Sequence, residues 1–389
     1  MPQYKIALNN DGEMWMFVIS GGGLTSSQHP IAFLVERTTD MNRILVASTH
    51  TSMYIEQDGQ AWMWGYNAEG SLGNDSTADV CVPVAVCGEH FFVAISSNEH
   101  TVLALDNYQM LWWWGGMSTS CVPIAVYGDR SYNKVAAGYK EFAAIDGDGQ
   151  AWTWGWNTVG QLGNNTLVGE STPIAVYGGH IFCQISVGNN YMLAVDNVGN
   201  GWAWGLNTYG ELGNNSTVSQ RTPVAVCMAA LSNGFEFIDA NVAGSGVLNS
   251  SAGIDGDGNP ITWGYNGNGK LGINSTVNKS TPTVITGHAF CAISVGGDFM
   301  LGIEDNGTGY AWGSNNYGQL GRNNMIPVSV PSQICNAHSW SQINAGYRYS
   351  LGLDKSGNLW SWGNNETYGK LGQGFASGCK STPIAVCYP

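Results

Sequence analysis

One long motif is repeated along this chain, and the repetition constrains the fold more than any single residue does. The stretch from Ala151 to Val176 is AWTWGWNTVGQLGNNTLVGESTPIAV, and Gly201 to Val226 is GWAWGLNTYGELGNNSTVSQRTPVAV. Both contain Trp-x-Trp-Gly, then Asn-x-x-Gly-x-Leu-Gly, then a Thr-Pro-aliphatic segment. Since each copy can bury its apolar face only against its neighbours, the repeat predicts an array of stacked units.

Each copy contains signals for four short strands. A turn from Asp196 to Gly199 separates two of them, with Asp first and Gly fourth, which is typical of a type I turn closed by a glycine of positive φ. Four short strands in about 50 residues are typical of a propeller blade, so we predict an all-β fold, a β-propeller. The expected strands of this copy are residues 185–188, 191–195, 201–204 and 222–226.

Seven complete copies can be counted from the second Trp of each motif. We therefore predict seven blades of four antiparallel strands over residues 41–389, with eight blades, one incomplete, as the alternative. Residues 1–40 are a degenerate partial repeat without the leading strand, expected to be a cap or to supply ring-closing strands. The counted tryptophans, expected to pack between neighbouring blades as the structural core, are Trp64, Trp114, Trp154, Trp204, Trp263, Trp312 and Trp362.

Two copies depart from the regular length. The Asn-x-x-Gly-x-Leu-Gly loop is missing after Trp114, and about nine extra residues follow Cys227. The longer segment, residues 228–249, contains Phe235 and Phe237, which we expect to be exposed. Breaks in a regular ring are where a specific partner is expected to bind.

The motif resembles a known family. Trp-Gly-x-Asn-x-x-Gly-x-Leu-Gly, together with Asp-x-x-Gly and Ala-Gly-x-x-x-x-Leu (345–351), is similar to the repeats of the regulator of chromosome condensation family over residues 41–389 and, weakly, before them. The resemblance implies a β-propeller, usually of seven blades, and some relatives are guanine-nucleotide exchange factors. Family members commonly carry a His at the start of the second strand. Here Thr51 and Thr101 hold that position, and His50 and His100 lie one residue earlier.

Charge and hydropathy exclude two classes of partner. The formal net charge is −14 and no Lys/Arg run offsets it, so binding of nucleic acid is not expected. No stretch approaches the 18 or so apolar residues of a membrane span, so no membrane insertion is expected. The N-terminus lacks the apolar region of a secretory signal, which predicts cytoplasmic synthesis and leaves later assembly into an extracellular or virion structure open.

Catalytic and metal-binding motifs are not found. Asp146-Gly-Asp-Gly and Asp255-Gly-Asp-Gly are interpreted as hairpin turns, not calcium loops, and no hydrolase, nucleotide or zinc signature occurs. We predict no enzyme, no cofactor and no metal site. The nine Cys are interpreted mainly as buried small hydrophobes, with disulfides as the alternative. Four histidines that recur ahead of a first strand, and are therefore assigned to the scaffold, are His90, His180, His288 and His338.

The favoured function is a non-enzymatic scaffold that binds protein or glycan partners through rim loops, including a homo-oligomer or an appendage of a virion. The alternative is a guanine-nucleotide exchange factor for a small GTPase, with Glu236 and Asp239 as the wedge against the nucleotide site. Aromatic loop residues could bind a partner or pack under their own loops. The candidate partner-binding residues are Phe235, Glu236, Phe237, Asp239, Tyr66, Trp156, Tyr265, Tyr209 and Tyr317.

Overall fold

The fold is taken from a computed structural model that divides the chain into two units, Met1–Asn42 and Arg43–Pro389. It describes residues 3–8, 14–19, 32–35 and 43–387, the last range with gaps at 98–99, 127–129, 228, 230–233, 241–248 and 336–337. Each unit is considered by itself.

The smaller unit is a three-stranded antiparallel sheet in the order β1-β2-β3. Its strands are β1 (Gln3–Leu8), β2 (Met14–Ile19) and β3 (Ala32–Val35), and Trp15 of β2 lies opposite Ala7 and Leu34. These are the strand positions that the partial repeat predicts, and the leading strand is absent from this sheet. Its role as a cap or as ring-closing strands stays a prediction.

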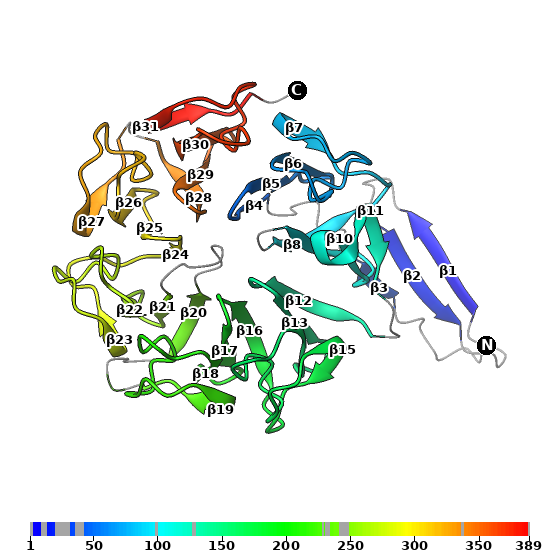
Figure 1. The fold of residues 1–389 in the computed structure, drawn as a ribbon. Coiled ribbons are helices and arrows are strands. Elements are labelled where there is room, and N and C mark those ends of the chain that lie inside the picture. The colour runs from blue at the N-terminus through cyan, green and yellow to red at the C-terminus, as the bar shows by residue number, and fades with distance from the viewer. Residues whose placement is uncertain are drawn as a thin grey trace. The chain divides into compact units, whose positions relative to one another are not determined.

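The larger unit is a ring of seven four-stranded antiparallel sheets, each built from consecutive strands (Figure 1). The prediction of a seven-bladed β-propeller is confirmed. Blades 1 to 3 are β4 (Ile44–Ala47), β5 (Thr51–Ile55), β6 (Ala61–Gly65), β7 (Val80–Ala85); β8 (Phe92–Ser97), β9 (Thr101–Asp106), β10 (Leu111–Gly115), β11 (Ser120–Ala125); β12 (Tyr132–Ala137), β13 (Glu141–Asp146), β14 (Ala151–Gly155), β15 (Glu170–Ala175). Blades 4 and 5 are β16 (Phe182–Val187), β17 (Tyr191–Asp196), β18 (Gly201–Gly205), β19 (Gln220–Ala225); β20 (Phe235–Ala240), β21 (Ser250–Asp255), β22 (Pro260–Gly264), β23 (Lys279–Val284). Blades 6 and 7 are β24 (Ala292–Val295), β25 (Phe299–Ile303), β26 (Gly309–Gly313), β27 (Val328–Gln333); β28 (Trp340–Ala345), β29 (Tyr349–Asp354), β30 (Leu359–Asn364), β31 (Cys379–Ala385).

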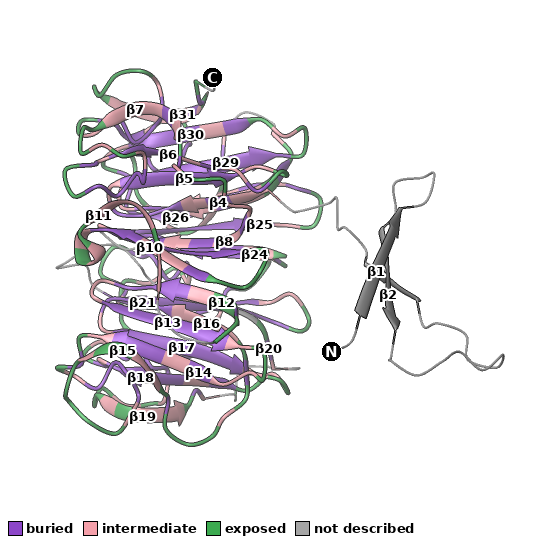
Figure 2. Ribbon diagram, turned by 90° about the vertical axis from the view of Figure 1, so that its right-hand side faces the viewer, coloured by how far each residue is buried: buried purple, intermediate pink, exposed green. Residues whose placement is uncertain are grey.

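The first strand of every blade faces the centre of the ring, and these strands enclose a channel with a cavity of about 470 Å³ (Figure 1). Neighbouring first strands belong to separate sheets and share no backbone ladder, so side chains join them. Ser96 Oγ accepts from the backbone N–H of Ala137 at 3.0 Å, and Asn344 Oδ1 accepts from that of Ala47 at 2.9 Å. Buried residues fill most of the second and third strands of the blades, whereas exposed residues lie mainly in the connections (Figure 2).

The buried indole of each third strand joins one blade to the blade before it. In Trp204, Nε1 donates to the carbonyl of Gln161 at 3.0 Å, beside the fully buried loop residue Leu162. Trp154 is the exception among the described residues, since the preceding blade lacks the loop that would supply the carbonyl. The other five bonds run from Trp64 to Lys370, Trp114 to Ser71, Trp263 to Glu211, Trp312 to Lys270 and Trp362 to Gln319, at 2.8–2.9 Å.

Hydrogen bonds of the loop asparagine give the loop the same shape in each repeat. Asn207 Oδ1 accepts from the N–H of Leu212 at 3.0 Å, and its Nδ2 donates to the carbonyls of Ser216 and Val218. One side chain thus replaces the missing backbone partners of a loop that forms no ladder. The motif Asn of the other loops accepts the same bond from the N–H of the loop Leu, and every loop Leu is buried.

The ring closes without an exchanged strand. Blade 7 and blade 1 are both complete, and they meet through the contacts used at the other junctions (Figure 1). The Tyr349 hydroxyl donates to the Thr51 carbonyl at 2.6 Å, and Ser52 Oγ donates to the Lys370 carbonyl at 2.8 Å. The eight-bladed alternative is therefore wrong.

The turns between second and third strands lie on the opposite side of each blade from the Asn-x-x-Gly-x-Leu-Gly loops. Asp146 accepts from the N–H groups of Asp148 and Gln150 and from Trp152 Nε1 at 2.8 Å, and Gly199 has the expected positive φ of 86°. The carboxylate is thus occupied in stabilising its own turn, as the hairpin interpretation predicts.

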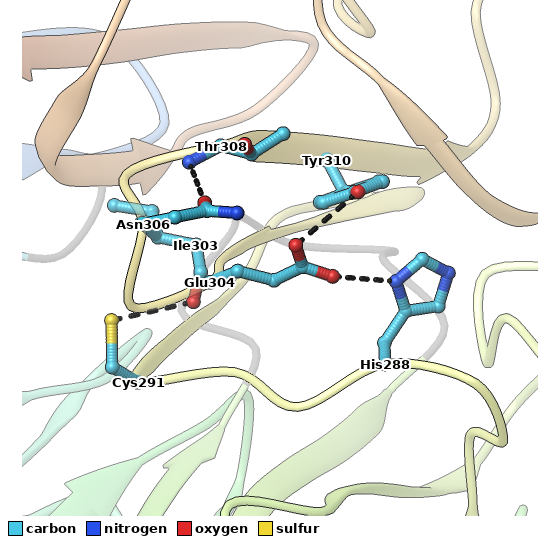
Figure 3. A network of polar contacts seen from close by, with 7 residues as sticks. All are labelled: His288, Cys291, Ile303, Glu304, Asn306, Thr308 and Tyr310. Carbon is cyan, nitrogen blue, oxygen red and sulfur yellow. Dashed lines mark hydrogen bonds and ion pairs between the residues drawn. The ribbon is translucent and has the colours of Figure 1, made fainter.

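A stacked histidine recurs beside these turns. His180 lies 3.9 Å from Trp202 between ring centroids, and His90 and His338 contact their tryptophans in the same way. In blade 6 a tyrosine replaces the Trp. There Glu304 pairs with His288 at 3.0 Å and accepts from the Tyr310 hydroxyl at 3.3 Å (Figure 3). Repetition of one contact around the ring confirms that these histidines belong to the scaffold.

The prediction for the cysteines is wrong in one respect. All nine are described and free, but none of them is buried, and Cys183, Cys291 and Cys387 are exposed. Three of the cysteines, Cys87, Cys227 and Cys387, follow the outermost strand of a blade. The edge of that strand faces solvent, so these positions lie outside the core.

The joint between blades can be tested with matched variants. Trp204→Phe keeps most of the buried apolar area but leaves the Gln161 carbonyl without its donor, whereas Trp154→Phe breaks no such bond. An unsatisfied buried group costs about 1–3 kcal/mol, so Trp204→Phe is expected to lower the free energy of unfolding by that much more than Trp154→Phe. Denaturant unfolding measures both values, and equal losses would contradict the proposed role of the bond.

Candidate functional site

The loop face is the side of the ring that carries the connections between first and second strands and between third and fourth strands. In blade 2 the long loop is absent, as predicted, and a single turn of 3-10 helix, η1 (Gly116–Ser118), joins β10 to β11. The shortened connection leaves a cavity of about 320 Å³, called here the blade 2 hollow. It is lined by Glu69, His100, Thr101, Gly116, Met117, Tyr139 and Lys140.

Exposed apolar groups lie beside charged groups at this hollow. Met117 is 44% exposed, and its N–H donates to Thr101 Oγ1 at 3.0 Å, which fixes the turn. Trp156 is 48% exposed, and the Lys140 ammonium lies 3.8 Å from the centroid of its ring. Glu69 approaches His100 at 4.0 Å on the other side. The exposed apolar side chains of Met117 and Trp156 therefore lie at this hollow together with two charged residues, Glu69 and Lys140.

A cluster of four rings borders the hollow at His100. The imidazoles of His50 and His100 are stacked with centroids 5.8 Å apart, and Tyr66 lies 5.2 Å from His100. Tyr368 of blade 7 packs edge-on against His50 at 5.4 Å and against Tyr66 at 4.9 Å. Side chains of blades 7, 1 and 2 thus form one continuous part of the loop face.

The electrostatics of this cluster favour a neutral His50. Burial, the positive charge of Lys370 and the neighbouring His100 together lower the pKa of His50 to about 4. Lys370 is 3% exposed, and burial together with Arg348 lowers the pKa of its ammonium to about 8. Sequence reasoning did not single out Lys370. Its signal is a Lys at the variable position of Gly-x-Leu-Gly, where the other copies have Ser, Gln, Glu or, at Lys270, also Lys.

Other ionisable groups are buried elsewhere on this face. Glu141 accepts from the N–H of Asn190 at 2.7 Å, and burial raises the pKa of its carboxyl to about 7. Burial also raises the pKa of Glu211, which accepts from the N–H of Tyr209 at 2.6 Å. Lys270 is fully buried and donates to the Gly297 carbonyl at 2.8 Å.

The predicted tyrosines are half-buried and pack against neighbours. Tyr209 and Tyr265 contact each other across blades 4 and 5 with centroids 5.2 Å apart. The Tyr317 hydroxyl accepts from Arg348 at 3.0 Å. Tyr66 belongs to the four-ring cluster described above. Of the predicted loop aromatics, Trp156 is the one with a largely exposed ring. A role for any of them in partner binding stays a prediction.

The expectation of an exposed Phe235 is wrong. Phe235 begins β20, is 4% exposed and packs 5.8 Å from Trp263 between ring centroids. The segment 228–249 is thus not one inserted loop, because it contains the first strand of blade 5. Glu236 is exposed, and the side chain of Phe237 lies outside the described residues.

The extra length is divided between two connections. Residues 226–234 precede β20, compared with 176–181 before β16, and residues 241–249 follow it, compared with 188–190 after β16. The larger part of the extra length therefore falls between β20 and β21.

Asp239 lies in the channel wall and not on a rim loop. Its carboxylate accepts from Ser186 Oγ at 3.1 Å and from the N–H groups of Ala240 and Val295 at 2.9 Å. Burial raises the pKa of this carboxyl to about 6 in spite of these donors. A side chain that joins three first strands cannot also act as a mobile wedge, so the expected wedge position is wrong for Asp239.

Family models match most of the ring. The regulator of chromosome condensation (RCC1) repeat matches residues 58–105, 148–195, 199–246, 257–303 and 306–353, and a second model of the same repeat matches 290–319 and 340–370. The chain belongs to this family.

Two curated relatives share one name. The X-linked retinitis pigmentosa GTPase regulator of dog is 33% identical over 86 residues, which are 21% of this chain and 8% of that protein. The mouse protein of the same name is 32% identical over 83 residues, with the same coverage. The match thus spans about 8% of the length of these relatives.

Solved structures share the fold. Yeast RCC1 (Prp20), solved bound to Kap60, has a TM-score of 0.73 and 15% identity, with 95% of this chain and 91% of that chain covered. Human WBSCR16 has a TM-score of 0.72 and 17% identity, with 86% and 93% covered. The described residues of this RCC1-repeat protein contain no helix of the length and apolar character that a bilayer span needs.

The pH dependence of stability tests the four-ring cluster. Because the pKa of His50 falls from 6.5 to about 4 on folding, its contribution to stability is complete above pH 6.5 and is lost as the pH falls towards 4. His50→Phe keeps a ring in the stack but cannot titrate, so its unfolding free energy should fall less steeply than that of wild type in this range. His180→Phe, on the opposite face, is the control. Identical slopes for wild type and His50→Phe would refute the assignment.

Proposed function

We propose that this propeller is a non-enzymatic scaffold that binds a protein partner over the blade 2 hollow on its loop face. The observation that carries the proposal is the exposure of Met117, in the blade whose long loop is missing, and of Trp156, in the next blade. Aromatic residues and methionine are enriched in the cores of protein interfaces, and Trp dominates binding hot spots. Lys140 and Glu69 would then contribute polar contacts at the edge.

Relatives support a protein as the partner. Yeast RCC1 has been crystallised with Kap60, and a second structure of that protein, at 17% identity, is described together with its binding to Gsp1p and histones. A glycan is the alternative partner, because an exposed indole can also stack on a sugar ring. Assembly of copies into a homo-oligomer or a virion structure stays a proposal on the same surface.

Nucleotide exchange on a small GTPase is the second candidate. The observation in its favour is the likeness of a short segment to relatives named as a GTPase regulator. With Asp239 occupied in the channel wall, the connection of residues 241–249 and the exposed Glu236 are the parts of the insertion left to act on a GTPase.

Exposed aromatics on the two faces give a matched test of the scaffold. Trp156→Ala should weaken binding of a partner identified by co-purification by about tenfold or more, which corresponds to about 1.4 kcal/mol. Tyr108→Ala removes a ring that is 79% exposed in a turn on the opposite face, and should leave binding unchanged. Titration calorimetry of the purified pair measures both. Equal affinities of the two variants would overturn the site, and binding to a glycan array alone would favour the alternative.

Shortening one connection tests the exchange candidate. Residues 241–249 are replaced by a connection as short as 188–190, while β20 is kept because it belongs to the blade core. Release of labelled nucleotide from a panel of small GTPases is then followed. Exchange activity predicts acceleration by wild type and its loss in the shortened variant. No acceleration by wild type with any GTPase would eliminate this function without affecting the scaffold.

A further inference from the structure

We propose that the junction between blades 7 and 1 binds an oxyanion, a carboxylate or phosphate group carried by the docked partner, between the side chains of Lys370, Arg348 and His50. The inference adds the partner's chemistry to the proposed function and uses that function only for the source of the anion. The site itself lies on the loop face, next to the blade 2 hollow through the stack of His50 on His100.

Two buried polar atoms at this junction, Thr49 Oγ1 and His50 Nδ1, have no hydrogen-bond partner among the described residues. Lys370 is 3% exposed, and its positive charge acts on His50. Buried polar groups are normally paired, since leaving one unpaired costs free energy. All three side chains can donate hydrogen bonds, which is the arrangement that receives an anion.

The charged group that acts on Lys370 is the positive guanidinium of Arg348. Arg348 comes from the hairpin between β28 and β29, and its guanidinium lies over the rings of Tyr317 and Tyr347 at 4.8 and 4.5 Å. No carboxylate lies within ion-pair distance of Lys370 or Arg348 among the described residues. The ammonium itself lies 5.0 Å from the ring of Tyr349.

The equivalent lysine of blade 5 has the opposite surroundings. Lys270 donates to the Gly297 carbonyl at 2.8 Å, and the negative charges of Asp298 and Glu211 raise the pKa of its ammonium against the effect of burial. At Lys370 the corresponding influence is the positive charge of Arg348, which lowers the pKa. The two lysines therefore differ in their partners: Lys270 has a carbonyl and two negative charges near it, whereas the charged group that acts on Lys370 is Arg348.

Aromatic side chains make this junction a bounded site. Tyr66 and Tyr368 pack edge-on at 4.9 Å beside His50, and both are half-buried. They restrict access of water to the cations, and an ionic bond is stronger where water is excluded. A charged group on a bound protein would be oriented here while its apolar residues cover Met117 and Trp156.

Inorganic phosphate and acetate are the probes, with chloride used to keep the ionic strength constant. Each is titrated at neutral pH into wild-type protein, Lys370→Met and Lys270→Met, and the melting temperature is measured by calorimetry. A bound anion stabilises the fold by mass action, so the wild-type Tm is expected to rise by about 2 °C or more well above the Kd. Lys370→Met should lose this rise, and Lys270→Met should retain it.

The variant without ligand gives a second measurement. Because Lys370 is a buried cation without a counter-ion, Lys370→Met is expected to melt at the same temperature as wild type or higher, whereas a structural lysine would lower it. Arg348→Gln, on a half-buried hairpin residue, should weaken anion binding by about tenfold.

The outcomes separate this inference from the proposed function. No rise in the wild-type Tm with either anion, or an equal rise in Lys370→Met, overturns the anion site. A response to phosphate but not to acetate assigns a phosphate group, and a response to both includes a carboxylate. Trp156→Ala should lose the partner but keep the Tm response, so each claim can fail alone.

Discussion

The hydrogen bond from a buried indole to a loop carbonyl of the preceding blade is the interaction on which the ring depends. A single four-stranded sheet of this size cannot bury its own Trp, and its first and last strands would be left as open edges. The loop Asn orders the loop, the loop Leu anchors it in its own blade, and the carbonyl beside that Leu then meets the indole of the next blade. The ordered loop of one blade thus holds the next blade in place at six of the seven junctions.

The missing loop of blade 2 follows from this design and explains where the candidate site lies. Removing the loop costs one interblade hydrogen bond, at Trp154, and uncovers the side chains that the loop would cover in any other blade. The remaining junctions still close the ring, because each is made by the same contacts and none depends on blade 2 alone. A repeat architecture can therefore open a binding surface at one blade at limited cost to stability.

The repeated positions could be predicted from the sequence, and the positions where copies differ could not. Seven blades, the Trp core, the turn carboxylates and the loop leucines were predictable, because copies at equal spacing reveal what each residue does in all of them. Phe235 was misjudged because its strand resembles the other first strands only weakly, so it was grouped with the inserted residues. Aligning Phe235–Ala240 with Phe182–Val187 places it correctly. The buried Glu141 and Lys370 had no such guide, since neighbouring copies carry a different residue at the same register.

Lys270 and Lys370 occupy equivalent positions in two blades, so comparing them shows what charge contributes to the loop face. Lys270 and Lys370 occupy the same place relative to the loop and to the next indole, and their backbone carbonyls accept the same bond from Trp312 and Trp64. The two lysine positions therefore have the same packing requirements. Packing alone explains neither why a lysine is found at this position nor which charged groups lie near it. Four of the six loops have Ser, Gln or Glu there, so a cation is not needed for the joint. In blade 5 the lysine balances two carboxylates inside the protein. In blade 7 it stands beside Arg348 and a neutral His50, and the balancing charge has to come from outside the chain.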